Sequence, residues 1–307
     1  MGKPDLLIVG SVGLDTIHTP AEKVEHVLGG TAVFASCAAS YLCNAGIVGV
    51  VGDDFSWDYE ALLKDKRVDL TCLERAPGKT FFWEGAYADD MNERATLDTQ
   101  LGVFADFSPK IPDSHRSVPF LFLGNIHPQL QLDVLNRMTD APVIAADTMN
   151  FWMTDTLELL KQVVRRVDIM LVNDSEAKQF TGKTDVLTAA DAILGMGPKM
   201  VIIKKGDHGA MLFAKKQIFV VPAVPLRTAK DPTGAGDTFA GGMMGYLAKM
   251  GKCDFTIMRQ AIVMGTVMAS FTVEDFSVNR LAKVDGAMIK QRVDLIRELT
   301  AFEDIRL

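Results

Sequence analysis

The sequence has few cysteines and histidines, and neither type is arranged as a binding motif. Its four cysteines show no Cys-x-x-Cys pair, and its five histidines show no spacing typical of metal ligands. The first residues also lack the pattern of a secretory signal peptide. These absences argue against a disulfide framework and a Cys/His metal site, and they predict reduced thiols and a cytoplasmic location.

The chain also lacks a basic block and carries a formal net charge of −7. This charge argues against nucleic acid and anionic membrane surfaces as partners. Residues 27–52 contain no charged side chain and are long enough to span a bilayer. Their glycines and polar residues instead fit a glycine turn, a buried helix to about Leu42 and a strand over Ile47–Val51. We therefore expect no membrane partner, and any anionic ligand must be held by a local site and a metal.

The second half of the chain alternates between apolar strand patterns and amphipathic helix patterns. With 307 residues and 48% hydrophobic side chains, one α/β domain with a small appendage is the expected organisation. The alternation predicts a parallel, doubly wound sheet. The predicted strands are Phe120–Leu123, Val143–Ala146, Ile169–Val172 and Val201–Lys204, and the predicted helices include Gln129–Met138, Asp155–Arg166, Leu187–Met196, Phe239–Met250 and Phe255–Phe271.

Polar and glycine residues follow a fully apolar first strand, Leu6–Gly10. Asp15 lies just past its carboxyl end, which is the edge where open α/β sheets bind ligands. Gly29 and Gly30 open the next helix, where paired glycines let a ligand approach the backbone. A solvated loop acid and a simple turn are the alternatives. Further on, a strand over Thr80–Ala88 places aromatic residues on one face, as core, dimer contact or ligand wall.

The stretch Asp231-Pro232-Thr233-Gly234-Ala235-Gly236-Asp237 precedes an apolar, small-residue helix. Its glycines leave backbone N–H groups bare at the helix N-terminus, which favours an anion there. An aspartate beside an anion site would repel a phosphate unless it has its own task. That task would be to accept a proton from a hydroxyl that attacks the phosphate. An ordinary glycine-rich turn with a first-turn acid remains the alternative.

Asn173 and Glu176 lie three residues apart at the end of a buried strand and the start of a helix. Both side chains offer oxygen atoms, which suit hydrated Mg²⁺. Asp174 or Ser175 could instead simply cap this helix.

These motifs resemble those of the ribokinase/pfkB family of carbohydrate and nucleoside kinases. The stretch from Asp231 matches the family signature D-T-x-G-A-G-D with Pro232 in place of the usual Thr, and the Gly-Gly and N-x-x-E motifs occur in family order. The resemblance implies a ribokinase-like α/β fold with a mostly parallel sheet flanked by helices and a small β-sheet lid. It implies one domain over residues 1–307 with lid inserts at about 12–28 and 78–104, and a possible homodimer through the lid.

The resemblance also implies an ATP-dependent kinase that transfers the γ-phosphate to a hydroxyl of a sugar or sugar-like molecule. Asp237 would be the general base, and the amides of Gly234, Ala235 and Gly236 would form the anion hole. Asp15, Gly29 and Gly30 would bind the substrate. The nucleotide would contact Asn173, Glu176, Lys205, Gly206, Gly209 and Thr233, with Mg²⁺ held through water by Asn173 and Glu176 and a monovalent cation such as K⁺ by Asp231.

The sequence departs from the family at Phe34, where the family usually has an asparagine that contacts the substrate. If Phe34 lines the substrate pocket, its ring would disfavour a fully hydroxylated sugar and would suit a nucleoside base. Alternatively, Phe34 turns into the core and Asn150 takes over the work of the amide. A sugar is the leading substrate class and a nucleoside the second. A catalytically silent ligand sensor on the same fold is a further alternative.

Overall fold

The computed structural model describes residues 3–91, 94–140 and 143–305. Its largest sheet has nine strands in the order β13-β12-β11-β10-β9-β8-β1-β4-β5. Strand β12 runs antiparallel to both neighbours, and the other adjacent strands are parallel, so the predicted doubly wound sheet is confirmed. The strands are β1 (Leu6–Val9), β4 (Ala45–Val51), β5 (Asp69–Arg75), β8 (Phe120–Leu123), β9 (Val143–Ala146), β10 (Ile169–Asn173), β11 (Met200–Lys204), β12 (Ala210–Ala214) and β13 (Gln217–Val221).

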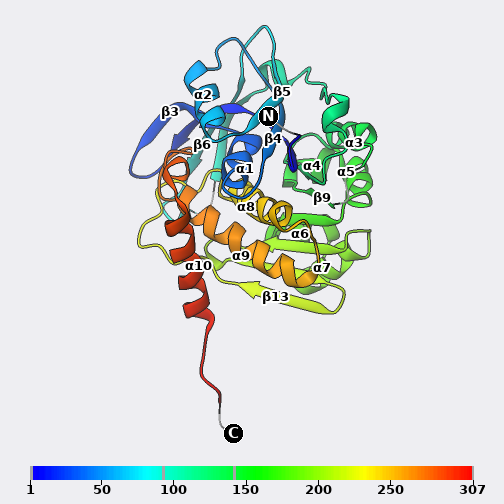
Figure 1. The fold of residues 1–307 in the computed structure, drawn as a ribbon, viewed down its shortest axis with the longest axis vertical. Coiled ribbons are helices and arrows are strands. Elements are labelled where there is room, and N and C mark those ends of the chain that lie inside the picture. Colours follow the sequence, from blue (N-terminus) through cyan, green and yellow to red (C-terminus); the bar gives the residue numbers. More distant parts are fainter. Residues whose placement is uncertain (1–2, 92–93, 141–142, 306–307) are drawn as a thin grey trace.

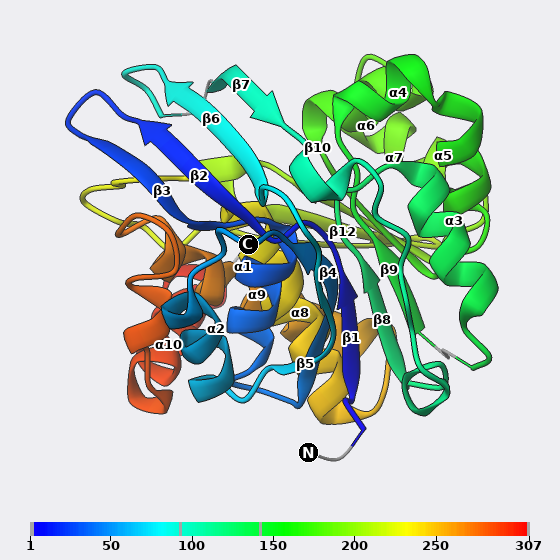
Figure 2. The same cartoon turned by 90° about the horizontal axis from the view of Figure 1, so that it is seen from above.

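Helices cover both faces of this sheet (Figures 1 and 2). One apolar core joins the sheet to α1, α8 and α9, and a second joins its other face to α3, α5, α6 and α7. The α-helices are α1 (Thr31–Ala39), α2 (Trp57–Asp65), α3 (Pro128–Arg137), α4 (Asn150–Asp155), α5 (Leu157–Val164), α6 (Asp174–Thr181), α7 (Val186–Leu194), α8 (Ala235–Met250), α9 (Phe255–Thr272) and α10 (Gly286–Thr300). Short 3₁₀ turns are η1 (Gly102–Phe104), η2 (Asp113–His115), η3 (Gly206–His208) and η4 (Leu281–Lys283).

Four further strands form a separate small sheet that stands beside the main one (Figure 2). Their order is β3-β2-β6-β7, with bounds β2 (Gly13–His18), β3 (Lys23–Gly29), β6 (Phe81–Tyr87) and β7 (Arg94–Gln100). Asp15 lies past the carboxyl end of β1, within strand β2, and it is buried, so it is not the solvated loop acid that was the alternative. The pattern hides β2 because a buried aspartate interrupts the residues of one face.

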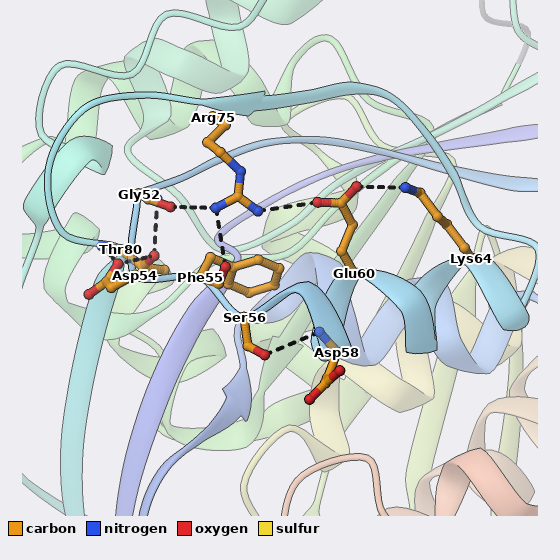
Figure 3. Close-up of polar contacts among 9 residues, drawn as sticks. All are labelled: Gly52, Asp54, Phe55, Ser56, Asp58, Glu60, Lys64, Arg75 and Thr80. Carbon is orange, nitrogen blue, oxygen red and sulfur yellow. Dashed lines mark hydrogen bonds and ion pairs between the residues drawn. The ribbon is translucent and has the colours of Figure 1, made fainter.

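A polar network fixes the base of strand β6 to the loop that follows β4 (Figure 3). Asp54 accepts hydrogen bonds from both the backbone N–H and the hydroxyl of Thr80, each at 2.7 Å. Arg75 donates to the carbonyl oxygens of Gly52 and Phe55 at 3.0 and 3.1 Å. These bonds set the point from which the small sheet projects.

Among the described residues, no helix is both long and apolar enough to cross a membrane. The cytoplasmic location predicted from the sequence stays a prediction.

Candidate active site

Three polar residues lie at the carboxyl ends of adjacent strands. Asp147 follows β9, Asn173 ends β10 and Lys204 ends β11, and Asn173 lies opposite Lys204 in the sheet register. The chain reverses its direction across the sheet between β1 and β8, and ligands of open α/β sheets bind beside such a reversal. These residues therefore mark the expected edge of a site.

Helix α8 presents its N-terminus at this site. The helix begins at Ala235 because Gly234 has a left-handed backbone conformation, with a φ of 75°. A Cβ atom at Gly234 would also lie only 2.4 Å from ring carbons of Phe34. The start of α8 therefore requires glycine at this position, and it brings the amides of Ala235 and Gly236 and the carboxyl of Asp237 into the first turn.

The carboxyl group of Asp237 is partly buried and lies among other charges. Burial and the nearby charge of Asp147 raise its pKa to about 6, while Lys204, the Thr31 hydroxyl and Arg94 lower it. A carboxyl with a pKa of about 6 is ionised at neutral pH yet is a stronger base than a solvent-exposed aspartate. It is suited to accept a proton.

Lys204 is a site residue that the sequence analysis missed. Its ammonium group forms an ion pair with Asp147. Burial lowers the pKa of Lys204, but the charges of Asp147, Glu176 and Asp237 outweigh burial and the net shift is upward. Lys204 is therefore a cation that neutralises a buried acidic cluster. Its position as the last residue of an apolar strand was the signal that could have identified it.

Asp15 lies near the loop of residues 231–237, whose acidic side chains act on it. Burial and the charges of Asp231 and Asp237 raise its pKa to about 8. A Cβ atom at Gly29 would lie 1.9 Å from an Asp15 carboxylate oxygen, so glycine is needed there to accommodate that carboxyl. The adjacent Gly30 has a φ of 97° and forms the N-cap of α1.

Phe34 and Asn150 lie apart from each other. Phe34 is 1% exposed within α1, and its ring packs in the core against Gly234. Asn150 is exposed at the start of α4. The substrate contacts predicted for these two residues stay predictions, and the structure gives Phe34 a packing role.

Tyr87, on the aromatic face of β6, contacts the loop of residues 231–237. The Tyr87 hydroxyl lies 2.9 Å from the Thr233 hydroxyl, and burial raises the pKa of Tyr87. On the adjacent strand β7, Arg94 lies opposite Tyr87, and its guanidinium is 5.2 Å from the centre of the Trp83 ring. The charge of Arg94 lowers the pKa values of Asp15 and Asp237. The sequence analysis assigned no role to this arginine.

A cavity of about 540 Å³ adjoins the start of α8. Lys204, Gly206, Gly209 and Gly236 line its polar end, with Asp90 and Met91 from the turn between β6 and β7. Apolar and small residues line the remainder, including Val224, Pro225, Leu226, Ala269 and Val273. The volume and the apolar lining suit a nucleotide. Among the described residues, Lys205 does not line this cavity; it lies just past the end of β11, at the N-cap of η3.

Asn173 and Glu176 form a capping box at the start of α6. The Asn173 side chain accepts a hydrogen bond from the Glu176 N–H at 2.8 Å, and the Glu176 carboxylate accepts one from the Asn173 N–H at 2.7 Å. Burial raises the pKa of Glu176 to about 7, against the charge of Lys204. The described part of the chain has no group of three or more His, Cys, Asp or Glu residues that could hold a metal. A metal here would therefore depend on water and ligand oxygens.

Asp231 has one unsatisfied carboxylate oxygen. Its Oδ1 accepts a hydrogen bond from the Thr233 N–H at 2.8 Å, whereas its buried Oδ2 has no hydrogen-bond partner among the described residues. Burial raises the pKa of Asp231 to about 6. A buried anionic oxygen without a donor is a suitable ligand for a cation.

Comparison with known proteins finds relatives that match most of the chain. The family model of the pfkB family carbohydrate kinases matches residues 5–283. The cytidine kinase of Thermococcus kodakarensis is 31% identical over 252 residues, covering 79% of this chain and 88% of that protein. The crystal structure of the nucleoside kinase of Methanocaldococcus jannaschii has a TM-score of 0.76 at 18% identity and covers 96% of this chain and 100% of its own. A putative ribokinase II from E. coli, solved with ATP and Mg²⁺, has a TM-score of 0.78 at 17% identity, with the same coverage.

Proposed function

The chain belongs to the pfkB family of carbohydrate kinases, and on that premise we propose that it transfers the γ-phosphoryl group of ATP to a hydroxyl of a nucleoside. Its fold and family make it a small-molecule kinase that acts on a nucleoside or a sugar. The partly buried carboxyl of Asp237, in the first turn of α8 beside Lys204, is the observation that carries this proposal.

In the proposed reaction, Asp237 accepts the proton of the acceptor hydroxyl. The acceptor oxygen forms a bond to the γ-phosphorus, and the bond from that phosphorus to the β–γ bridging oxygen breaks, which releases ADP. Of the predicted anion-hole residues Gly234, Ala235 and Gly236, the Ala235 N–H already donates to the Pro232 carbonyl oxygen at 3.1 Å. The amides of Gly234 and Gly236 at the helix N-terminus would therefore stabilise the charge of the phosphoryl group. Lys204 adds a fixed positive charge next to this position.

The nucleotide would occupy the cavity of about 540 Å³, with its phosphates toward Lys204 and Gly236. Glu176 and Asn173 would hold Mg²⁺ through water, in keeping with the small number of protein ligands that Mg²⁺ usually takes. When bound, Mg²⁺ would neutralise charge on the donor phosphates. The E. coli relative solved with ATP and Mg²⁺ supports this choice of cofactors.

One observation favours a nucleoside acceptor over the free sugar that is the leading class predicted from the sequence. The relatives reported above include a cytidine kinase and a nucleoside kinase. Asp15 and the Gly29–Gly30 pair would bind the ribose hydroxyls, with the carboxyl of Asp15 as a hydrogen-bonding group. We propose that the small sheet is a lid over this acceptor, and that a homodimer would form through the same sheet, where Leu97 is 55% exposed.

The proposed function is tested by a coupled assay of ADP release over nucleosides, pentoses, hexoses and polyols. We expect the highest kcat/KM with a nucleoside, and ADP release that depends on the acceptor. Equal background ATP hydrolysis with every compound would favour the silent sensor instead. A clear preference for a free sugar would restore the first substrate class predicted from the sequence.

Glu176→Gln is expected to raise the Mg²⁺ concentration for half-maximal activity about tenfold, as for other residues that orient metal-bound water. The acceptor KM should stay close to that of the wild type. Glutamine can still accept the capping hydrogen bond from Asn173, so the substitution removes charge and keeps the helix start. A Mg²⁺ titration that matches the wild type would contradict the role of Glu176.

Asp231→Asn is expected to weaken activation by K⁺. We expect the wild type to be more active in K⁺ than in tetramethylammonium salts. The variant should need about tenfold more K⁺, which corresponds to losing one charged contact. The unsatisfied Oδ2 of Asp231 is the reason, because an amide at this position carries no charge. Equal wild-type rates in both salts would exclude a role for K⁺ in activity.

A further inference from the structure

We infer that Trp83 is a positioning residue that holds the Arg94 guanidinium over the catalytic carboxylates, where Arg94 meets the transferring phosphoryl group. This inference rests on the proposed kinase function. It concerns two side chains of the small sheet for which the sequence motifs give no role.

The Trp83 indole is held flat against its own strand. Gly85 lies two residues further along the same face of β6, and a Cβ atom there would lie only 2.0 Å from the indole Cη2. The indole Nε1 donates a hydrogen bond to the Thr96 hydroxyl on β7 at 3.3 Å. Glycine at position 85 thus leaves space for the ring, and Thr96 fixes its direction.

The Arg94 guanidinium lies over the Trp83 indole, with its Cζ atom 5.2 Å from the ring centre. Such a contact between a guanidinium and an indole face is favourable, and it restricts an otherwise flexible side chain. Arg94 is exposed, and the Tyr87 side chain hydrogen-bonds it as well. The indole and Tyr87 therefore orient the guanidinium together.

Tyr87 places the Trp83–Arg94 pair close to the proposed site of phosphoryl transfer. This residue pairs with Arg94 across β6 and β7, and its hydroxyl lies 2.9 Å from that of Thr233, four residues before Asp237. The charge of Arg94 acts on Asp15, Asp237 and Glu176 together. A cation beside Tyr87, whose hydroxyl contacts the loop that precedes α8, is suited to stabilise the charge of the phosphoryl group during its transfer.

The test compares Trp83→Leu, Trp83→Phe and Arg94→Met with the wild type in the ADP-release assay. Trp83→Leu should lower kcat about tenfold and change the acceptor KM by less than about threefold, because it removes an orienting contact of the transition state. Trp83→Phe retains a ring and should restore most of kcat. In the Arg94→Met background, Trp83→Leu should have no further effect on kcat, since both act through one guanidinium.

Trp57 provides a matched control. Its ring stacks on Arg75, whose Cζ atom is 4.3 Å from the ring centre. Trp57 belongs to α2 and does not line the cavity beside α8. Trp57→Leu should leave kcat unchanged, and thermal unfolding of each variant checks that it is folded. Additive losses from Trp83→Leu and Arg94→Met would overturn the inference. So would a Trp83→Leu effect confined to the nucleoside KM, which would make the indole a base-stacking residue. A wild type without acceptor-dependent turnover would overturn the proposed function itself.

Discussion

Asp237→Asn is expected to lower kcat by about 10²–10⁴-fold, the usual contribution of a general base. Asparagine has nearly the same shape and can keep the first turn of α8, but it cannot accept the proton of the acceptor hydroxyl. The nucleotide cavity is lined by other residues, so nucleotide affinity should stay close to that of the wild type. The measurements are kcat with a saturating acceptor and calorimetric titration with an ATP analogue.

The pH dependence of wild-type activity is a second test of the role of Asp237. Because the pKa of Asp237 is raised to about 6, it loses its proton as the pH rises through that value. Activity should therefore fall on the acidic side near pH 6. Asp58→Asn, which alters an exposed first-turn acid of α2, is the control and should be fully active. Turnover of Asp237→Asn within about threefold of the wild type would exclude Asp237 as the base.

Lys204→Met is expected to lower kcat by about 10²–10³-fold, as for the loss of one preorganised group at an oxyanion. Methionine fills similar space but removes the positive charge beside Gly236 and the ion-pair partner of Asp147. Breaking a buried ion pair also costs about 3–5 kcal/mol of stability, so the midpoint of thermal unfolding should fall. Assays should therefore be run well below that midpoint.

The pH profile separates the electrostatic role of Lys204 from a purely structural one. The charge of Lys204 lowers the pKa of Asp237, so its removal should raise that pKa and move the acidic limb of the profile to higher pH. Lys205→Met is the comparison, because the neighbouring lysine lies outside the nucleotide cavity. A larger loss from Lys205→Met than from Lys204→Met would favour the residue predicted from the sequence.

The sequence predicted the parts of this molecule that depend on local patterns. Apolar runs and their alternation with helices identified the parallel sheet, and the glycines before Asp237 identified the helix N-terminus. The same local reasoning placed Asn173 and Glu176 on one helical turn, where the structure shows a capping box. Each of these features depends on residues that are close together in the chain.

The parts that the sequence could not predict depend on contacts between distant segments. Lys204 reaches the site because the last residue of β11 contacts Asp147, 57 residues earlier, whereas Lys205 lies past the end of the strand. The need for glycine at position 234 comes from the ring of Phe34, and that at position 29 comes from the carboxyl of Asp15. The orientation of Arg94 depends on Trp83 and on the pairing of β6 with β7. No local pattern contains this information.

We propose phosphoryl transfer to an acceptor hydroxyl with Asp237 as the base. The most direct test is mass spectrometry of a reaction that contains the wild-type protein, ATP, Mg²⁺ and a nucleoside, with Asp237→Asn in parallel. We predict one phosphorylated nucleoside for each ADP with the wild type, and almost none with the variant. ADP formed together with free phosphate, or equal product from both proteins, would contradict the claim.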